Sequence, residues 1–214
     1  MSDQSEAQPG EARPRGGVLT WALWGAALIG VAAVVYIMAQ SLTKPTTEMP
    51  VPTAPAATND SVSKKLTHAS DGTAAPDYAF NDAQGKPLKI ADLKGKVVVM
   101  NLWATWCGPC KIEMPTLAKL QAAYAGRPVA VVAISIDKPE ALAEAKAFIA
   151  AQAPLAFYND PAAKLPWALE PSAVGMPTTV IYGKDGLERG RIAGEAAWAA
   201  PDARAVIDKI LAEG

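Results

Sequence analysis

The chain has 214 residues, a formal net charge of −1 and 50% hydrophobic residues. This length gives room for one ordinary domain with extensions, but not for two large domains. The near-neutral charge and the lack of a basic run with interleaved aromatic residues argue against nucleic acid as a partner.

An uncharged apolar block spans residues 18–39, "VLTWALWGAALIGVAAVVYIMA". About 20 helical residues cross a hydrocarbon core roughly 30 Å thick. Arg13 and Arg15 precede the block and Lys44 is the first cation after it, which predicts a cytoplasmic N-terminus and an exported remainder. A cleaved signal peptide is the alternative, but its apolar region is usually only about 7–15 residues long. We therefore expect a single-pass anchor in the inner membrane.

The segments beside this block are polar. Residues 1–17 are too short and polar to fold, which predicts a cytoplasmic stub. Residues 40–73 are rich in Pro, Thr, Ser and Ala, and such a tether holds the folded part about 30 Å from its anchor. We expect a single folded domain over residues 74–214.

Expected strands and helices alternate along this domain. A turn signal at Gln84-Gly85 predicts an early hairpin, and another at residues 184–186 predicts a final one. Apolar, β-branched runs predict strands, whereas apolar residues at helical spacing predict helices. The main strands are expected at residues 97–103, 129–136 and 178–182, and the main helices after Cys107, at 139–151 and at 201–212. This order predicts an α/β fold with a mixed central sheet flanked by helices.

Cys107 and Cys110, in "WATWCGPCKIEMP", are the only cysteines of the chain. Zinc needs four ligands, and the chain adds only one histidine, His68, so a closed zinc site cannot be built. A disulfide between these neighbours closes a loop too small to stabilise the fold much. Two thiolates also suit Cu(I), so a copper-binding chaperone is an alternative use of the same pair.

The position of the pair favours redox chemistry. Cys107 follows an expected buried strand and begins a helix, whose N-terminus carries roughly half a positive charge and stabilises a thiolate. We therefore predict that Cys107 attacks, and that Cys110, one turn later and better shielded, resolves the mixed disulfide. Gly108 and Pro109 make the connection tight, and proline suits an early helical position.

Three segments carry a resemblance to a known family: "NLWATWCGPCKIEMP", "GMPTTVI" and "IAGEAAWAAPDA". They resemble the TlpA-like, membrane-anchored branch of the thioredoxin superfamily. The resemblance implies a thioredoxin-like fold in the periplasm and a thiol:disulfide oxidoreductase with no cofactor or metal beyond its redox-active Cys107–Cys110 pair. It assigns Cys107 as the nucleophile and Cys110 as the resolving thiol.

The resemblance also assigns roles to further residues. Pro177 matches a cis-proline that faces the cysteine pair across the substrate groove. Glu113 matches an acidic residue below the cysteines, although a solvated helix glutamate is an equally open interpretation. The remaining groove positions that it implies are Trp106, Gly108, Pro109 and Met176.

One position departs from ordinary thioredoxin. Asn101 stands where thioredoxin has a buried aspartate, and an amide cannot act as a general base. Glu113 or water is then expected to take the proton. Pro115 matches a helix-kinking proline of the family.

The expected activity is the reduction of disulfides in client proteins. Gly-Pro between the cysteines is typical of reducing thioredoxins, and a periplasmic reductant needs a transmembrane electron donor. The expected clients are copper-handling proteins of cytochrome oxidase assembly or apocytochrome c. A disulfide-donating oxidase differs only in potential and stays an alternative, whereas the Pro-x-x-x-Thr-x-x-Cys pattern of peroxidases is missing.

Overall fold

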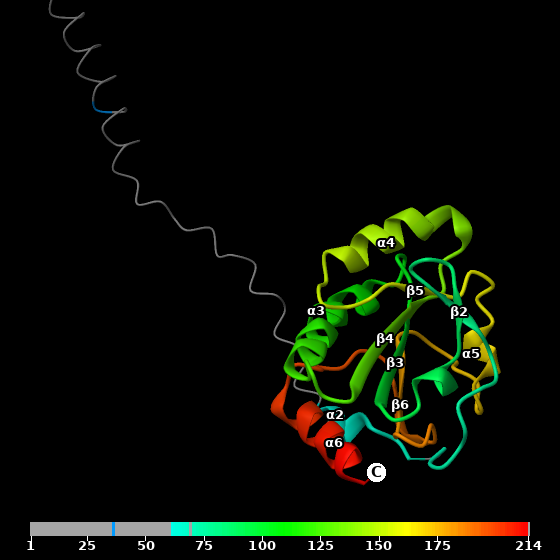
Figure 1. Ribbon diagram of the computed structural model, residues 1–214. Helices are drawn as coiled ribbons and strands as arrows, with labels where there is room; N and C mark the ends of the chain where they lie inside the picture. The colour runs from blue at the N-terminus through cyan, green and yellow to red at the C-terminus, as the bar shows by residue number, and fades with distance from the viewer. Residues whose placement is uncertain (1–35, 37–60, 69, 214) are drawn as a thin grey trace, which may run out of the picture. The chain divides into compact units, whose positions relative to one another are not determined.

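The computed structural model describes residue 36, residues 61–68 and residues 70–213 (Figure 1). The predicted stub, most of the predicted tether and the predicted anchor, Tyr36 apart, lie outside these residues. Within the described ranges, no helix is long and apolar enough to cross a membrane. The anchor over residues 18–39 therefore stays a prediction.

The domain is built on a mixed sheet of seven strands in the order β2-β1-β5-β4-β3-β6-β7. β3 is parallel to β4, and β4 is parallel to β5, whereas the other neighbouring pairs are antiparallel. The central strand β3 is buried along its whole length, as its continuous apolar run predicts. The strands are β1 Phe80–Asp82, β2 Pro87–Leu88, β3 Val97–Trp103, β4 Val129–Ser135, β5 Tyr158–Asn159, β6 Thr178–Tyr182 and β7 Glu188–Ala193.

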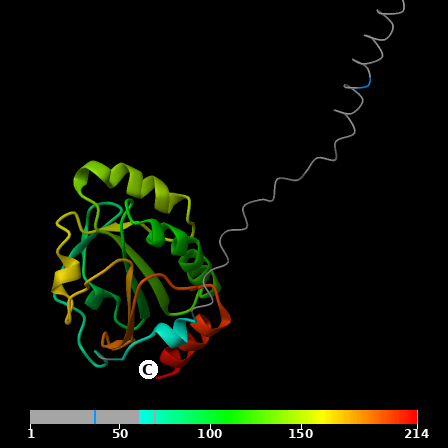
Figure 2. The ribbon, with the colours of Figure 1, turned by 180° about the vertical axis from the view of Figure 1, so that it is seen from behind.

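Helices cover both faces of this sheet (Figures 1 and 2). Successive residues of β3 point to opposite faces, so Val99 and Trp103 pack with α3 and α6, while Met100 and Leu102 pack with Leu165 of α5. The helices are α2 Val62–Lys65, α3 Gly108–Ala123, α4 Leu142–Ala150, α5 Leu165–Ala168 and α6 Pro201–Ala212, with 3-10 turns at Ile90–Leu93 and Pro139–Ala141.

The predicted α/β architecture with a mixed, helix-flanked sheet is confirmed. The strands at 97–103 and 178–182 and the helix at 201–212 have the predicted bounds. Both expected hairpins are present as β1–β2 and β6–β7. Pro115 lies inside α3, as expected.

The start of the domain differs from the prediction. α2 belongs to the last part of the predicted tether, yet Val62 is fully buried in the core beside α6. Ser61 donates its hydroxyl hydrogen bond to Asp202 of α6 (2.6 Å), and Thr67 forms an antiparallel bridge with Arg191 of β7. Residues 61–68 and 70–73 are thus folded, and the expected boundary at residue 74 is too late. One helical turn is too short to show a periodic pattern in the sequence.

Candidate active site

Cys107 and Cys110 form a disulfide at the N-terminus of α3, with their Cα atoms 5.3 Å apart. Cys107 caps the helix, and the Cys110 N–H donates to its Sγ atom over 3.3 Å. Pro109 occupies the first turn, where the missing N–H costs no helical hydrogen bond. Cys107 keeps 6% of its surface exposed and Cys110 none, so Cys107 is the less buried of the two residues, as predicted.

Two large apolar side chains near the disulfide are exposed, beside the exposed Lys111. Trp106 directly precedes Cys107 and is 69% exposed, and Ile112 on the first turns of α3 is 54% exposed. Gly108 and Pro109 are exposed between the cysteines. Large exposed apolar side chains at such a place mark a surface suited to binding another chain.

The Met176–Pro177 peptide bond is cis, as the resemblance implies. Thr178, the first residue of β6, pairs with Leu102, so Pro177 comes beside the end of β3. That end of β3 leads into the turn that carries Cys107. Met176 packs against the same apolar cluster as both cysteines. The structure therefore brings Met176 and Pro177 close to the end of β3 from which the chain continues to the disulfide.

Glu113 is 2% exposed, which contradicts the interpretation as a solvated helix glutamate. Its Oε1 accepts a hydrogen bond from Asn101 Nδ2 (2.6 Å), and its Oε2 accepts from the Ala196 N–H (3.1 Å) and Trp198 Nε1 (3.3 Å). Burial raises the pKa of Glu113 to about 7, although these three hydrogen bonds act in the opposite direction. The side chain can thus hold or release a proton near neutral pH.

Asn101 of β3 links α3 and β6 through hydrogen bonds to Glu113 and Thr179. It is fully buried, and its Nδ2 also donates to Thr179 Oγ1 on β6 over 2.9 Å. Its Oδ1 is a buried acceptor with no hydrogen-bond partner in the described part of the chain. Asn101 therefore orients the Glu113 carboxyl group, and it cannot replace that group as a base.

Asp137 is a residue of the site that sequence reasoning missed. Its carboxylate, 1% exposed, accepts from the Thr105 N–H (2.9 Å), the Thr105 hydroxyl (2.8 Å) and the Ser135 hydroxyl (2.8 Å). These contacts fix the turn just before Trp106 and Cys107. The sequence signal for Asp137 was a single acidic residue just after the buried strand β4. Functional side chains of α/β proteins are often found at this carboxyl end of the strands.

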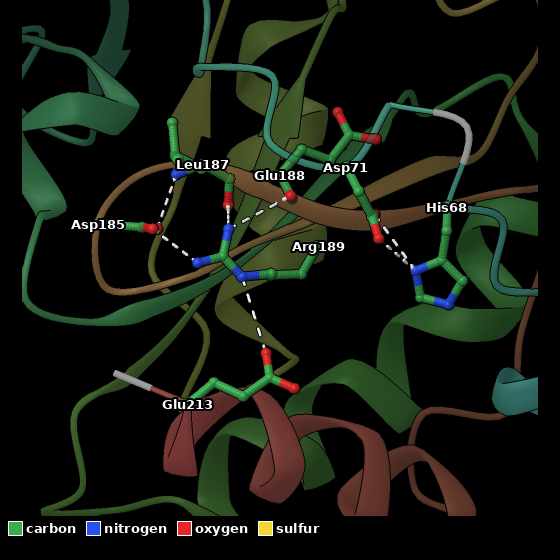
Figure 3. Close-up of polar contacts among 7 residues, drawn as sticks. All are labelled: His68, Asp71, Asp185, Leu187, Glu188, Arg189 and Glu213. Carbon is green, nitrogen blue, oxygen red and sulfur yellow. Dashed lines mark hydrogen bonds and ion pairs between the residues drawn. The ribbon is translucent and has the colours of Figure 1, made fainter.

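A cavity of about 470 Å³ lies away from the cysteines, between α2, β7 and α6. Leu66, Val206 and Ile210 are among the apolar residues that line it. Polar side chains that line it have partners in Figure 3: His68 contacts Asp71, also a lining residue (3.0 Å), and Arg189 pairs with Asp185 (2.6 Å). Across residues 61–68 and 70–213, no three His, Cys, Asp or Glu side chains gather where they could hold a metal ion.

A buried central strand that leads to a Cys-x-x-Cys disulfide at a helix N-terminus, with a cis-proline just before the neighbouring strand, defines a thioredoxin-like thiol-disulfide oxidoreductase. More particularly, the chain belongs to the AhpC/TSA family, whose model matches residues 72–187. The matched range includes Cys107, Cys110, Glu113 and Pro177.

Comparison with known proteins agrees with this class. The chain is 32% identical over 132 residues to the thiol-disulfide oxidoreductase ResA of Bacillus thuringiensis (strain Al Hakam), covering 58% of this chain and 70% of the relative. It is 44% identical over 78 residues to the thioredoxin-like protein YneN of Bacillus subtilis (strain 168), covering 36% of this chain and less than half, 45%, of that protein.

A solved structure shares the fold. The crystal structure of a thiol:disulfide interchange protein of the thioredoxin family from Chlorobium tepidum TLS is 28% identical, with a TM-score of 0.55 over 65% of this chain and 97% of that one. Together with the relatives, it confirms the expected TlpA-like class within the thioredoxin superfamily.

Proposed function

We propose that this protein is a membrane-anchored periplasmic reductase that transfers two electrons from its Cys107–Cys110 dithiol to the disulfides of client proteins. The observation that carries the proposal is the disulfide at the N-terminus of α3, with Cys107 6% exposed and Cys110 fully buried. This asymmetry suits one thiol for attack on a client and the other for resolution.

The exchange runs in two displacement steps. In the reduced protein, the Cys107 thiolate attacks one sulfur of the client disulfide, and the first client thiolate leaves. The Cys110 thiolate then attacks Cys107 Sγ within this mixed disulfide, and the second client thiolate leaves. The client gains two electrons and takes up two protons, while Cys107 and Cys110 end as a disulfide. The free N–H groups and the dipole of α3 stabilise the Cys107 thiolate before attack.

Glu113 is suited to take the proton of Cys110. It lies one helical turn further along α3, and burial raises its pKa to about 7. A base with a pKa near the working pH balances availability of the carboxylate against proton affinity. Asn101, held against Glu113, supplies the orientation that such a transfer needs.

The client would bind across the apolar surface beside the disulfide. Met176 and Pro177 lie beside the end of β3 that leads to the cysteines, and Trp106, directly before Cys107, is exposed. Met176 is half-buried and Pro177 is buried, so in this proposal an extended client segment pairs with the backbone at Met176. In this assignment the groove consists of Trp106, Gly108, Pro109, Met176 and Pro177.

The cellular setting of the proposal comes from the sequence. The apolar segment 18–39 would anchor the chain in the inner membrane and place the domain in the periplasm. Because that compartment is oxidising, a transmembrane electron donor would have to re-reduce the Cys107–Cys110 disulfide. The proposed clients are oxidised copper-assembly proteins or apocytochrome c.

The reduction potential of the Cys107–Cys110 couple tests the direction of electron flow. We expect a value near that of thioredoxin, about −270 mV, from equilibration with glutathione or dithiothreitol buffers. A value near about −120 mV would assign the protein as a disulfide donor instead.

A further inference from the structure

A buried ion pair on β7 is not used by the thiol chemistry. Arg191 donates from Nε and Nη2 to the two carboxylate oxygens of Glu188, at 2.7 Å each. The Arg191 side chain is 12% exposed and that of Glu188 is 2% exposed. A buried ion pair is often no more stabilising than apolar residues of similar size. Its effect on the position of neighbouring segments is therefore the more informative property.

The same guanidinium also reaches the segment that leads to the cis-proline. Arg191 Nη1 donates to the carbonyl oxygen of Pro171, and Nη2 donates to that of Glu170 (3.0 Å). Five residues further along, this segment reaches Met176 and Pro177. We call residues 170–177 the recognition loop. Val174, near its middle, is 93% exposed.

The far end of the recognition loop is held by backbone and hydroxyl contacts. The Gly194 N–H, just after β7, donates to the Pro177 carbonyl oxygen over 2.8 Å. The Thr178 hydroxyl donates to the Gly175 carbonyl oxygen over 2.7 Å. β7 and its extension thus hold both ends of the loop: Arg191 holds the beginning and Gly194 holds the end.

Arg191 itself is attached to a rigid part of the fold. Its backbone pairs with Val180 of β6 on one side and exchanges hydrogen bonds with Thr67 on the other, at 2.9 and 3.0 Å. Only a planar guanidinium with five N–H donors can bind both oxygens of Glu188 and two carbonyl groups together. A lysine ammonium has three donors on one atom and cannot span these acceptors.

We propose that Arg191, held by Glu188, is a positioning residue for client recognition: it sets the recognition loop and thereby the position of the half-buried Met176, next to the buried Pro177, for contact with the client. The inference rests on the proposed reductase function and adds the residue pair that determines how a polypeptide is recognised. Neither the Arg191 nor the Glu188 side chain lies at the sulfur atoms. The pair therefore affects how tightly a protein disulfide is bound. The intrinsic reactivity of Cys107 is not affected.

The test compares a protein substrate with a small one in single turnovers. Pre-reduced full-length protein in detergent is mixed with rising concentrations of insulin, and separately with oxidised glutathione. For Arg191→Lys we expect the half-saturating insulin concentration to rise about tenfold, since a misplacement of about 1 Å can cost up to ~100-fold. The rate constant with glutathione, and the equilibrium constant from which the reduction potential is obtained, should each stay within about twofold of wild type, a change of less than about 0.4 kcal/mol.

Two further variants complete the comparison. The double variant Glu188→Gln/Arg191→Gln removes both charges, leaves no buried carboxylate unpaired, and should show the same selective loss. Arg189→Lys is the matched control, because Arg189 lies two residues away on β7 and its side chain contacts Asp185, Glu213 and the carbonyl oxygens of Leu187 and Glu188 (Figure 3). Among the described residues, these side-chain partners include no residue of the recognition loop. We expect wild-type behaviour from it.

The outcomes separate the inference from the function on which it rests. Unchanged insulin saturation in both the lysine and the double variant would overturn the positioning role. An equal loss with insulin and glutathione would also overturn it, since that pattern indicates general damage to the site. If wild-type protein reduced neither substrate, the proposed function itself would be wrong, and the inference with it.

Discussion

Glu113 shows how burial decides the chemistry of a single side chain. Three donors surround its carboxyl group, and each favours the charged form, yet the loss of hydration is larger and raises the pKa to about 7. The nearby Glu195 carboxylate also raises the pKa of Glu113. The result is a carboxyl group that can hold or release a proton near neutral pH, one helical turn beyond Cys110.

This raised pKa makes stability depend on pH. Between about pH 4.5 and 7 the folded protein keeps the Glu113 proton that the unfolded chain releases, so stability falls as pH rises through this window. The effect amounts to about 3 kcal/mol for this one group. Urea denaturation from pH 4 to 8 should show that Glu113→Gln lacks this decline, whereas Glu140→Gln, at an exposed position, retains it. Identical profiles for wild type and Glu113→Gln would contradict the assignment.

Glu113 also bears on the rate of exchange. We expect Glu113→Gln to slow the resolution step at pH 7 by roughly tenfold, less than the ~100-fold of a general base in direct contact with its proton. Rapid-quench analysis of the mixed disulfide on Cys107 measures this step. Attack by Cys107 should be unchanged, and an unchanged lifetime of the mixed disulfide would assign the proton transfer to water.

At the scale of elements, α3 and β6 provide the site, while α2 and β7 support it from the side. α2 buries Val62 against α6, and Thr67 extends the sheet beyond β7 at Arg191. Leu66 also packs close to Gly190, where a Cβ atom would come within 2.9 Å of its side chain. The N-terminal residues 61–68 are thus part of the framework that holds β7, rather than a flexible connection to it.

This arrangement predicts where the chain can be shortened. A protein starting at Ser61 should be more stable than one starting at Ala74 by about 3 kcal/mol, because the shorter form loses the burial of Val62 and the hydrogen bonds of Ser61 and Thr67. Urea denaturation of both forms, each with the disulfide intact, measures the difference. Equal midpoints would show that these contacts add nothing to the domain.

At the scale of the whole molecule, the proposed function gives the domain and the apolar segment 18–39 separate tasks. The domain holds the disulfide and would bind the client, and the segment would supply the location. Because an oxidised Cys107–Cys110 pair needs electrons from outside, attachment near a membrane donor would shorten the distance over which the partners must meet.

If segment 18–39 is a retained anchor, the full-length protein should stay bound to the membrane in cells. Immunoblotting should find a species of about the full 22.3 kDa in the membrane fraction, resistant to extraction by salt and carbonate. Replacing Leu28 and Val34 by arginine within the apolar segment should prevent its insertion. A shortened species in the soluble fraction would instead indicate a cleaved signal peptide.

Local sequence signals were sufficient for the strands, for the main helices and for the cysteine pair. Val97–Trp103 is apolar at every position but one, and Cys107 and Cys110 stand where that strand meets a helix, so neighbours along the chain carry the information. Only tertiary structure could decide between a buried and a solvated Glu113, because its burial depends on Ala196 and Trp198, more than 80 residues away. The supporting contacts of Asp137 and Arg191 also depend on which strands become neighbours, since hydrogen bonds between distant segments leave no periodic pattern in the chain.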